Sequence, residues 1–140
     1  MTSEYIQKLK EKKVIALAME YIQDDVGSYP VVRIMSEIAG TSAMSTAASL
    51  LSKSKGGKGI LLGGISGVPP VKVVILGAGV VAEFAIRAAL GVGADLRVFD
   101  NNVYKLMRLQ NIIGTRLNTS TLNPMQLCLL YTSPSPRDRG

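Results

Sequence analysis

Residues 72–100 read KVVILGAGVVAEFAIRAALGVGADLRVFD, and this stretch decides the fold. It begins with a short β-branched apolar run without alternation, which is typical of a central parallel strand covered on both faces. Gly77, Ala78 and Gly79 form the turn that follows at once, and a segment with helical periodicity comes next. A second apolar run over residues 96–99 then indicates another strand. This order predicts a strand, a helix and a second, parallel strand.

The glycine turn has the composition of a phosphate-binding turn. Gly77 permits the tight turn out of the strand, and Gly79 has no Cβ, so a pyrophosphate can come close to the main chain there. Free N–H groups and the positive end of the helix dipole would attract the anion. Ala82 takes the third small position of the pattern, where the helix must lie close to the strand. The pattern predicts a dinucleotide site.

Asp100 completes this pattern. It ends the second strand 21 residues after Gly79, close to the expected separation of about 20 residues. A carboxylate there can accept hydrogen bonds from both hydroxyls of an adenosine ribose and would repel a 2′-phosphate, so NAD is predicted rather than NADP. A purely structural interpretation stays open, in which Asp100, Asn101 and Asn102 turn the chain and cap a helix that starts near Val103. The two roles are compatible.

The helix after the turn is expected to have one buried side and one polar side. Glu83 and Arg87 lie on the polar side, one turn apart, and are spaced to form an ion pair. Gly91 and Gly93 are expected to end the helix. The residues expected on the buried side are Val81, Phe84, Ala85, Ala88 and Val92.

Upstream of this unit, the periodicity predicts two helices and a strand. Residues 3–13 are typical of a short amphipathic helix, and residues 14–19 of a buried strand. A long helix is expected from Ser36, its candidate N-cap, to about residue 53. Small residues on several of its faces would let neighbouring elements approach closely. Its apolar positions at helical spacing are Met35, Ile38, Ala39, Ala43, Ala47, Leu50 and Leu51.

The remaining segments predict an incomplete sheet. Residues 59–70 are apolar with glycine and proline breaks, and we expect them to approach the sheet and turn back. After Asp100 only one further helix and no convincing further strand are expected, whereas a complete dinucleotide fold has six strands. The predicted fold class is therefore α/β, with a partial Rossmann-type parallel sheet that a strand and a long linker helix precede.

The composition argues against nucleic acid, a metal centre and a membrane as partners. The net charge is +6, but glutamates dilute the lysines of residues 8–13, and an aromatic content of 5% leaves few rings to stack on bases. The chain has no histidine and one cysteine, Cys128, so we expect no metal site, no internal disulfide and no histidine acid–base catalyst. No uncharged apolar window reaches about 18 residues and no signal sequence is present, so a cytoplasmic protein is expected.

Several motifs agree in order and spacing with one protein family. They are ALAMEYIQDD, RIMSEIAG, GKGILLGGISGVPP, VVILGAGVVA and VFDNNVYKLMRLQN, and they lie within residues 12–124, the range that the likeness covers. Over this range the chain resembles bacterial alanine dehydrogenase. The family oxidises L-alanine with NAD and water to pyruvate, ammonium and NADH, and its full-length members are expected to be homo-oligomers.

The resemblance implies further residues of an NAD site. Ser36 matches a cofactor-contacting serine of the linker helix, Val80 and Val81 fall in the turn beside the cofactor, and Lys105 takes a basic position beside the adenosine. With Asp100 and the Gly77, Ala78 and Gly79 turn, they form the expected cofactor site. The family's substrate-binding and catalytic residues match no position of this chain, so it is expected to contain no catalytic residue and to be inactive alone.

The resemblance also divides the chain. Residues 1–29 would end the substrate domain, 30–58 form the linker helix, and 59–124 form a truncated NAD-binding domain. Residues 125–140, rich in serine and proline near their end, are expected to be disordered and foreign to the natural protein. Three other functions stay open: the NAD-binding subunit of a proton-translocating transhydrogenase, a non-catalytic NAD-sensing module, and a methyltransferase that uses S-adenosylmethionine.

Overall fold

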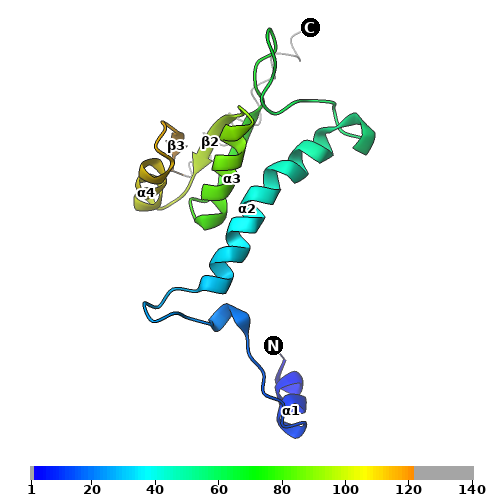
Figure 1. The fold of residues 1–140 in the computed structure, drawn as a ribbon, viewed down its shortest axis with the longest axis vertical. Helices are drawn as coiled ribbons and strands as arrows, with labels where there is room; N and C mark the ends of the chain where they lie inside the picture. The colour runs from blue at the N-terminus through cyan, green and yellow to red at the C-terminus, as the bar shows by residue number, and fades with distance from the viewer. Residues whose placement is uncertain (1, 122–140) are drawn as a thin grey trace. The chain divides into compact units, whose positions relative to one another are not determined.

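The computed structural model describes residues 2–121 (Figure 1). Contacts divide the chain into two compact units, Met1–Met35 and Ser36–Gly140, and the boundary falls inside the long helix α2. The predictions made for residues 125–140 lie outside the described residues. The division into substrate domain, linker and NAD-binding domain stays a prediction.

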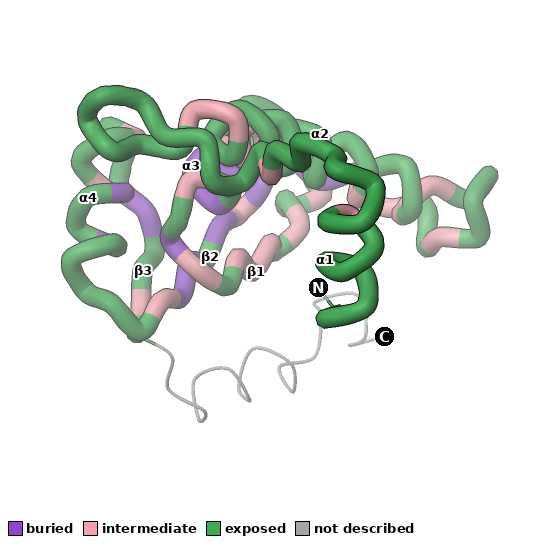
Figure 2. The backbone as a smooth tube through the Cα atoms, turned by 90° about the horizontal axis from the view of Figure 1, so that it is seen from below, coloured by how far each residue is buried: buried purple, intermediate pink, exposed green. Residues whose placement is uncertain are grey.

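The first unit has little core of its own. Helix α1 (Ser3–Glu11) is present as expected, but no residue of it is buried (Figure 2). The strand predicted over residues 14–19 is wrong, because this segment is irregular and leaves Ile15 90% exposed and Leu17 86% exposed. A strand needs a neighbour to take up its backbone hydrogen bonds, and the described part of this unit offers none. A short 3₁₀ helix, η1 (Met19–Tyr21), follows.

Helix α2 (Pro30–Leu51) begins earlier than predicted. Proline suits the first turn because its missing N–H would have no partner there. Ser36 is therefore not the N-cap but lies inside the helix. The buried positions also differ from the expected apolar set: Gly40 and Met44 are buried, whereas Ile38 and Leu50 are exposed.

Gly40 brings α2 into close contact with the next helix, α3 (Val80–Gly91). A Cβ on Gly40 would lie 2.8 Å from the Cβ of Phe84 and closer still to the Val81 carbonyl oxygen. The expectation that small residues allow close approach is confirmed at this position.

The segment between α2 and the sheet turns back as predicted. After the 3₁₀ helix η2 (Lys53–Lys55), Ile65 and Val68 form an isolated antiparallel bridge. Leu62 is buried, and its carbonyl accepts a 2.9 Å hydrogen bond from the Val71 N–H. This bond ties the loop to the residue just before the first strand.

The second unit contains a parallel three-stranded sheet in the order β1-β2-β3. Its strands are β1 (Lys72–Leu76), β2 (Asp95–Phe99) and β3 (Asn118–Ser120). Helix α3 links β1 to β2 and α4 (Val103–Ile113) links β2 to β3, which confirms the α/β, partial Rossmann-type fold. The sequence missed β3, because the polar run Asn-Thr-Ser gives no apolar signal.

β1 has one strand neighbour in the described chain, so it lies at an edge and is only half buried, not covered on both faces as predicted. The core of this unit lies between the sheet and its helices (Figure 2). Its largest fully buried side chains are Ile86 of α3, Val98 of β2 and Leu109 of α4.

The buried side of α3 is rotated from the predicted one. Ala85 is buried as expected, but Val81 and Val92 are exposed and Glu83 is buried. α3 contacts β1 and β2 of the sheet and also α4. The side of the helix that is covered therefore includes residues that face α4 as well as residues that face the sheet. The side chains that it buries are Ala82, Glu83, Ala85, Ile86 and Ala89.

Candidate nucleotide-binding site

Three residues connect the end of β1 to the start of α3, and two of them are glycines. Gly77 has a φ of 104°, a conformation that side-chain-bearing residues rarely adopt, so the turn requires glycine here. Its N–H donates a 2.6 Å hydrogen bond to the Phe99 carbonyl of β2. Ala78, the middle residue of the turn, is only 1% exposed. The turn is thereby anchored to the neighbouring strand.

Gly79 needs a different explanation from Gly77. Its φ of −86° and ψ of −167° are extended values that any residue adopts. A Cβ placed on it would meet no atom of the described chain within 4 Å. No contact within the described chain therefore requires glycine at this position. Open space over Gly79 is what the close approach of a ligand to the main chain needs.

The N-terminus of α3 begins at Gly79 and has no side-chain cap. The first N–H groups of a helix have no partner within the helix, and the helix dipole places partial positive charge beside them. This end of α3 can therefore donate several hydrogen bonds to an anion.

A shallow hollow of about 330 Å³ lies beside the turn. It brings together five of the residues predicted for the cofactor site, which are Ser36 from α2 and Gly77, Gly79, Val80 and Val81 from the turn and the start of α3. Ser36 is therefore at the glycine turn although it lies 41 residues before Gly77 in the sequence. The hollow is lined by Ser36, Ile75, Leu76, Gly77, Gly79, Val80, Val81, Ala82 and Ala85.

Asp100 lies directly after β2, and its carboxylate is held in place by the main chain. Oδ1 accepts a 2.7 Å hydrogen bond from the Asn102 N–H, and Oδ2 accepts one of 2.7 Å from the Ala78 N–H. These two bonds, with a smaller contribution from the positive charge of Lys105, lower the pKa of Asp100 below its ordinary value. The carboxylate is ionised at neutral pH, and each oxygen keeps a second lone pair for a ligand hydroxyl.

The structural interpretation of the residues after β2 is also confirmed. Asn102 is the N-cap of α4, and its side-chain oxygen accepts hydrogen bonds from the Tyr104 N–H at 2.9 Å and the Lys105 N–H at 3.3 Å. Lys105 is exposed in the first turn of α4. Neither Asp100 nor Lys105 lines the hollow, and Ala78 does not line it either.

Sequence reasoning missed that the buried Glu83 binds two partly exposed arginines near the turn. Glu83 is 6% exposed, and its carboxylate binds Arg87 at 3.2 Å and Arg108 at 3.3 Å. The predicted ion pair between Glu83 and Arg87 is confirmed. The prediction that Glu83 lies on the solvent-exposed side of the helix is wrong, because its side chain is buried. Arg108 also donates a 3.3 Å hydrogen bond to the Ala78 carbonyl. Arg108 gave no sequence signal, because it lies 25 residues after Glu83 on another helix.

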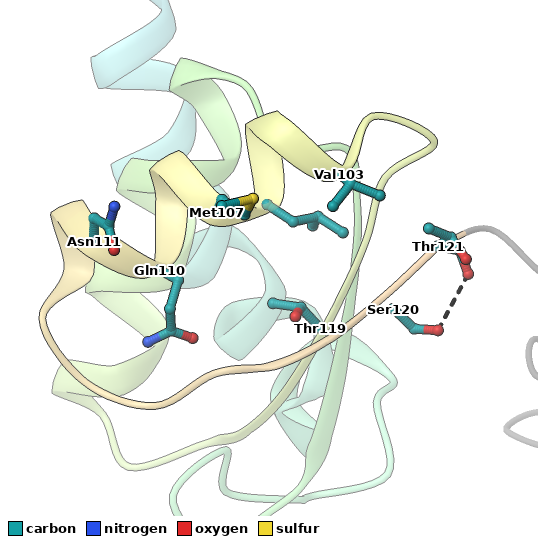
Figure 3. A pocket seen from close by; sticks show the side chains of 8 residues that line it. Val103, Met107, Gln110, Asn111, Thr119, Ser120 and Thr121 are labelled. Carbon is teal, nitrogen blue, oxygen red and sulfur yellow. Dashed lines mark hydrogen bonds between the residues drawn. The ribbon is translucent and has the colours of Figure 1, made fainter.

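A second hollow, of about 380 Å³, lies between α4 and β3 (Figure 3). Met107 and Gln110 line it from the helix, and Thr119 and Ser120 from the strand. It contains no charged side chain and none of the residues predicted for the cofactor site. Within residues 2–121 no group of three or more metal-binding side chains is present. No helix among these residues is long and apolar enough to cross a membrane.

The fold and the glycine turn define a Rossmann-like α/β unit, and comparisons with known proteins assign its family. The model of the family "Alanine dehydrogenase/PNT, C-terminal domain" matches residues 43–131. The chain belongs to this family, which confirms the resemblance predicted from the sequence motifs.

Individual relatives agree with this assignment. The chain is 41% identical over 119 residues to an alanine dehydrogenase of Bilophila wadsworthia (strain 3_1_6), covering 85% of this chain and 32% of the relative. It is also 41% identical over 121 residues to alanine dehydrogenase 2 of Staphylococcus aureus (strain USA300), with coverages of 86% and 32%. A solved L-alanine dehydrogenase structure superposes with a TM-score of 0.81 at 37% identity, covering 90% of this chain and 35% of that one. The chain thus spans about a third of the length of these relatives.

Proposed function

We propose that this chain is the NAD(H)-binding part of an alanine dehydrogenase. The observation that supports it best is the pairing of an uncapped α3 N-terminus, open over Gly79, with a carboxylate fixed beside it at Asp100. In this proposal residues 30–58 link the substrate domain, ending near residue 29, to a nucleotide domain over residues 59–124. The proposed cofactor site consists of Ser36, Gly77, Ala78, Gly79, Val80, Val81, Asp100 and Lys105.

Each group of the dinucleotide would find a matching group of the chain. The pyrophosphate would accept hydrogen bonds from the first N–H groups of α3, next to Gly79. The adenosine ribose would donate to Asp100, whose oxygens each keep a free lone pair. Lys105 would lie beside the adenosine, and Val80 and Val81 would cover the cofactor at the hollow. A 2′-phosphate would meet the ionised Asp100, so NAD(H) is preferred over NADP(H).

The complete reaction, from L-alanine, NAD and water to pyruvate, ammonium and NADH, is proposed for the whole protein. Bound NAD would accept the hydride from the substrate carbon. The chain's own contribution would be to hold and orient the nucleotide. It contains no histidine for acid–base work, so we expect no alanine-dependent NADH formation from the 140 residues alone. The family's amino-acid substrate and homo-oligomeric assembly belong to the same proposal.

Titration of the 140-residue chain with NADH, followed by nucleotide fluorescence, tests the proposal. NADH should bind saturably, NADPH more weakly, and S-adenosylmethionine should not compete. Asp100→Asn should weaken NADH binding about tenfold, because a hydrogen bond to a charged group is lost. Asp95→Asn is the matched control, since Asp95 begins the same strand and should leave the affinity unchanged. Equal affinities for NADH and NADPH, or no saturable binding, would contradict the proposal.

A further inference from the structure

Both backbone polar groups of Ala78, one in each of its two peptide groups, are hydrogen-bonded to other elements. Its N–H donates to Oδ2 of Asp100 at 2.7 Å, and its carbonyl accepts from Nη2 of Arg108 at 3.3 Å. The partners lie 22 and 30 residues away in the sequence, on two other elements of the unit. Ala78 is flanked by Gly77 and Gly79, which have the greatest backbone freedom of any residue. The two bonds therefore restrain the backbone at Ala78, where the neighbouring glycines would otherwise allow many conformations.

Arg108 is itself fixed by a buried acid. Its Nη1 lies 3.3 Å from Oε2 of Glu83, a residue that is almost completely buried on α3. Glu83 uses its other oxygen, Oε1, to bind Arg87 at 3.2 Å. Because the guanidinium is planar and rigid, the ion pair with Glu83 sets the direction in which Nη2 reaches the Ala78 carbonyl. Glu83, in the first turn of α3, is thus connected through Arg108 to the glycine turn that precedes the helix.

Arg87 offers an internal comparison. It binds the same carboxylate as Arg108 and is exposed to a similar degree, 46% against 43% of the side chain. Its second hydrogen bond goes to the Ile112 carbonyl near the end of α4, at 3.3 Å, and not to the glycine turn. The two arginines therefore share one partner and differ in whether they touch Ala78.

We propose that Glu83 and Arg108, together with Asp100, form a clamp on the N–H and the carbonyl of Ala78 that positions the glycine turn for a nucleotide diphosphate. Arg108 is a positioning residue and does not contact the ligand. By fixing Ala78, the clamp keeps the Gly79 main chain and the free N–H groups of α3 aimed at the phosphates before they arrive, which lowers the ordering cost of binding. The nucleotide part of this inference rests on the proposed function, whereas the clamp itself can be measured without ligand.

The test compares Arg108→Met with Arg87→Met in the 140-residue chain. Each variant loses one ion pair to Glu83, but only Arg108→Met frees the Ala78 carbonyl. Asp100 still accepts from the Ala78 N–H in both variants, but without the bond from Arg108 the turn should open more often and expose that N–H. Amide hydrogen exchange by NMR, without nucleotide, should therefore be about tenfold faster at Ala78 in Arg108→Met than in Arg87→Met, after correction for any difference in global stability. NADH affinity should fall about tenfold in Arg108→Met and change little in Arg87→Met.

Arg108→Lys keeps the charge and serves if Arg108→Met does not fold. A single ammonium cannot reproduce the fork that joins Glu83 to Ala78, so faster Ala78 exchange is expected here too. Equal exchange at Ala78 in the Arg108 and Arg87 variants would overturn the clamp, whatever the nucleotide does. Faster exchange in the Arg108 variants, with no NADH binding by the unsubstituted chain, would support the clamp and count against the proposed function.

Discussion

The N-termini of α3 and α4 follow neighbouring parallel strands but are completed in different ways. α4 is capped by its own sequence, since the Asn102 side chain accepts from two N–H groups of the first turn. The N-cap of α3 is Gly79, which has no side chain that could accept from the first N–H groups. One helix end is thus satisfied within the chain, and the other leaves its donors and its dipole available. In the proposed function, the helix end that lacks a side-chain cap is the one that binds the phosphates.

Adding a side-chain cap to α3 should weaken nucleotide binding more than any other substitution considered below. Gly79→Asp would place a carboxylate at the N-cap, where aspartate is favourable and where nothing lies within 4 Å of a Cβ. We expect the free energy of unfolding to stay equal or rise slightly. NADH binding should weaken by roughly a hundredfold or more, because the new negative charge opposes the phosphates. NADH titration and urea unfolding measure the two effects.

Gly79→Ala is the matched variant without the charge and should weaken NADH binding less. If Gly79→Asp bound NADH as tightly as the unsubstituted chain, the phosphates would have to lie elsewhere.

A second substitution should displace α2, which lines the hollow beside the glycine turn, without changing any residue of α4. Gly40→Leu would force α2 away from Val81 and Phe84, which a side chain at Gly40 would overlap. The free energy of unfolding should fall by about 1–3 kcal/mol from overpacking. NADH affinity should fall as well, because Ser36 on α2 lines the hollow.

Ala43→Leu adds a leucine at an exposed position of the same helix and should change stability by less than about 0.5 kcal/mol. Equal stability of the Gly40 and Ala43 variants would show that α2 and α3 do not pack closely at Gly40.

Removing the cap of α4 should lower stability and leave NADH affinity nearly unchanged, whereas capping α3 should lower NADH affinity and leave stability nearly unchanged. Asn102→Ala leaves the Tyr104 and Lys105 N–H groups without their side-chain acceptor, which should cost about 1 kcal/mol of stability. NADH affinity should change by no more than about twofold, because the Asn102 N–H that binds Asp100 belongs to the main chain and remains. Asn101→Ala, at the exposed neighbour, is the control for chemical denaturation. A large loss of NADH affinity in Asn102→Ala would mean that the two helix ends are not independent.

The smallest effect concerns pH. Because the folded chain lowers the pKa of Asp100, its hydrogen bonds stabilise the fold fully above the ordinary aspartate pKa of about 3.9. That contribution should be lost as the pH falls through the lowered pKa of the folded state. Asp100→Asn should flatten the acid side of the stability curve relative to the unsubstituted chain. Acid unfolding of Asp100→Asn identical to that of the unsubstituted chain would contradict this role.

Sequence reasoning succeeded where the physics is local. The glycine turn, the α3 and α4 boundaries near glycines and asparagines, and the carboxylate at Asp100 all follow from short-range geometry. β3 was missed because a three-residue polar strand is stabilised by β2 and not by its own composition. The strand predicted over residues 14–19 fails for the converse reason, since its apolar sequence has no strand beside it in the described part of its unit.

The ion pairs of Glu83 show a second limit of the sequence. The helical periodicity of the sequence places Glu83 on the polar side of α3, whereas the structure buries it. Its partner Arg108 comes from α4, and only the packing of the two helices brings them within 3.3 Å. The clamp on Ala78 was therefore invisible to pattern and spacing.

We propose that the uncapped N-terminus of α3 holds the phosphates of NAD(H). A titration of the ¹⁵N-labelled chain with NADH, in which the amide resonance of each residue is followed separately, tests this proposal. We expect the largest shifts at Gly79, Val80 and Val81, with smaller ones at Asp100 and none at the capped first turn of α4 around Tyr104. Saturable shifts confined to the hollow between α4 and β3, or none at Gly79 and Val80, would contradict it.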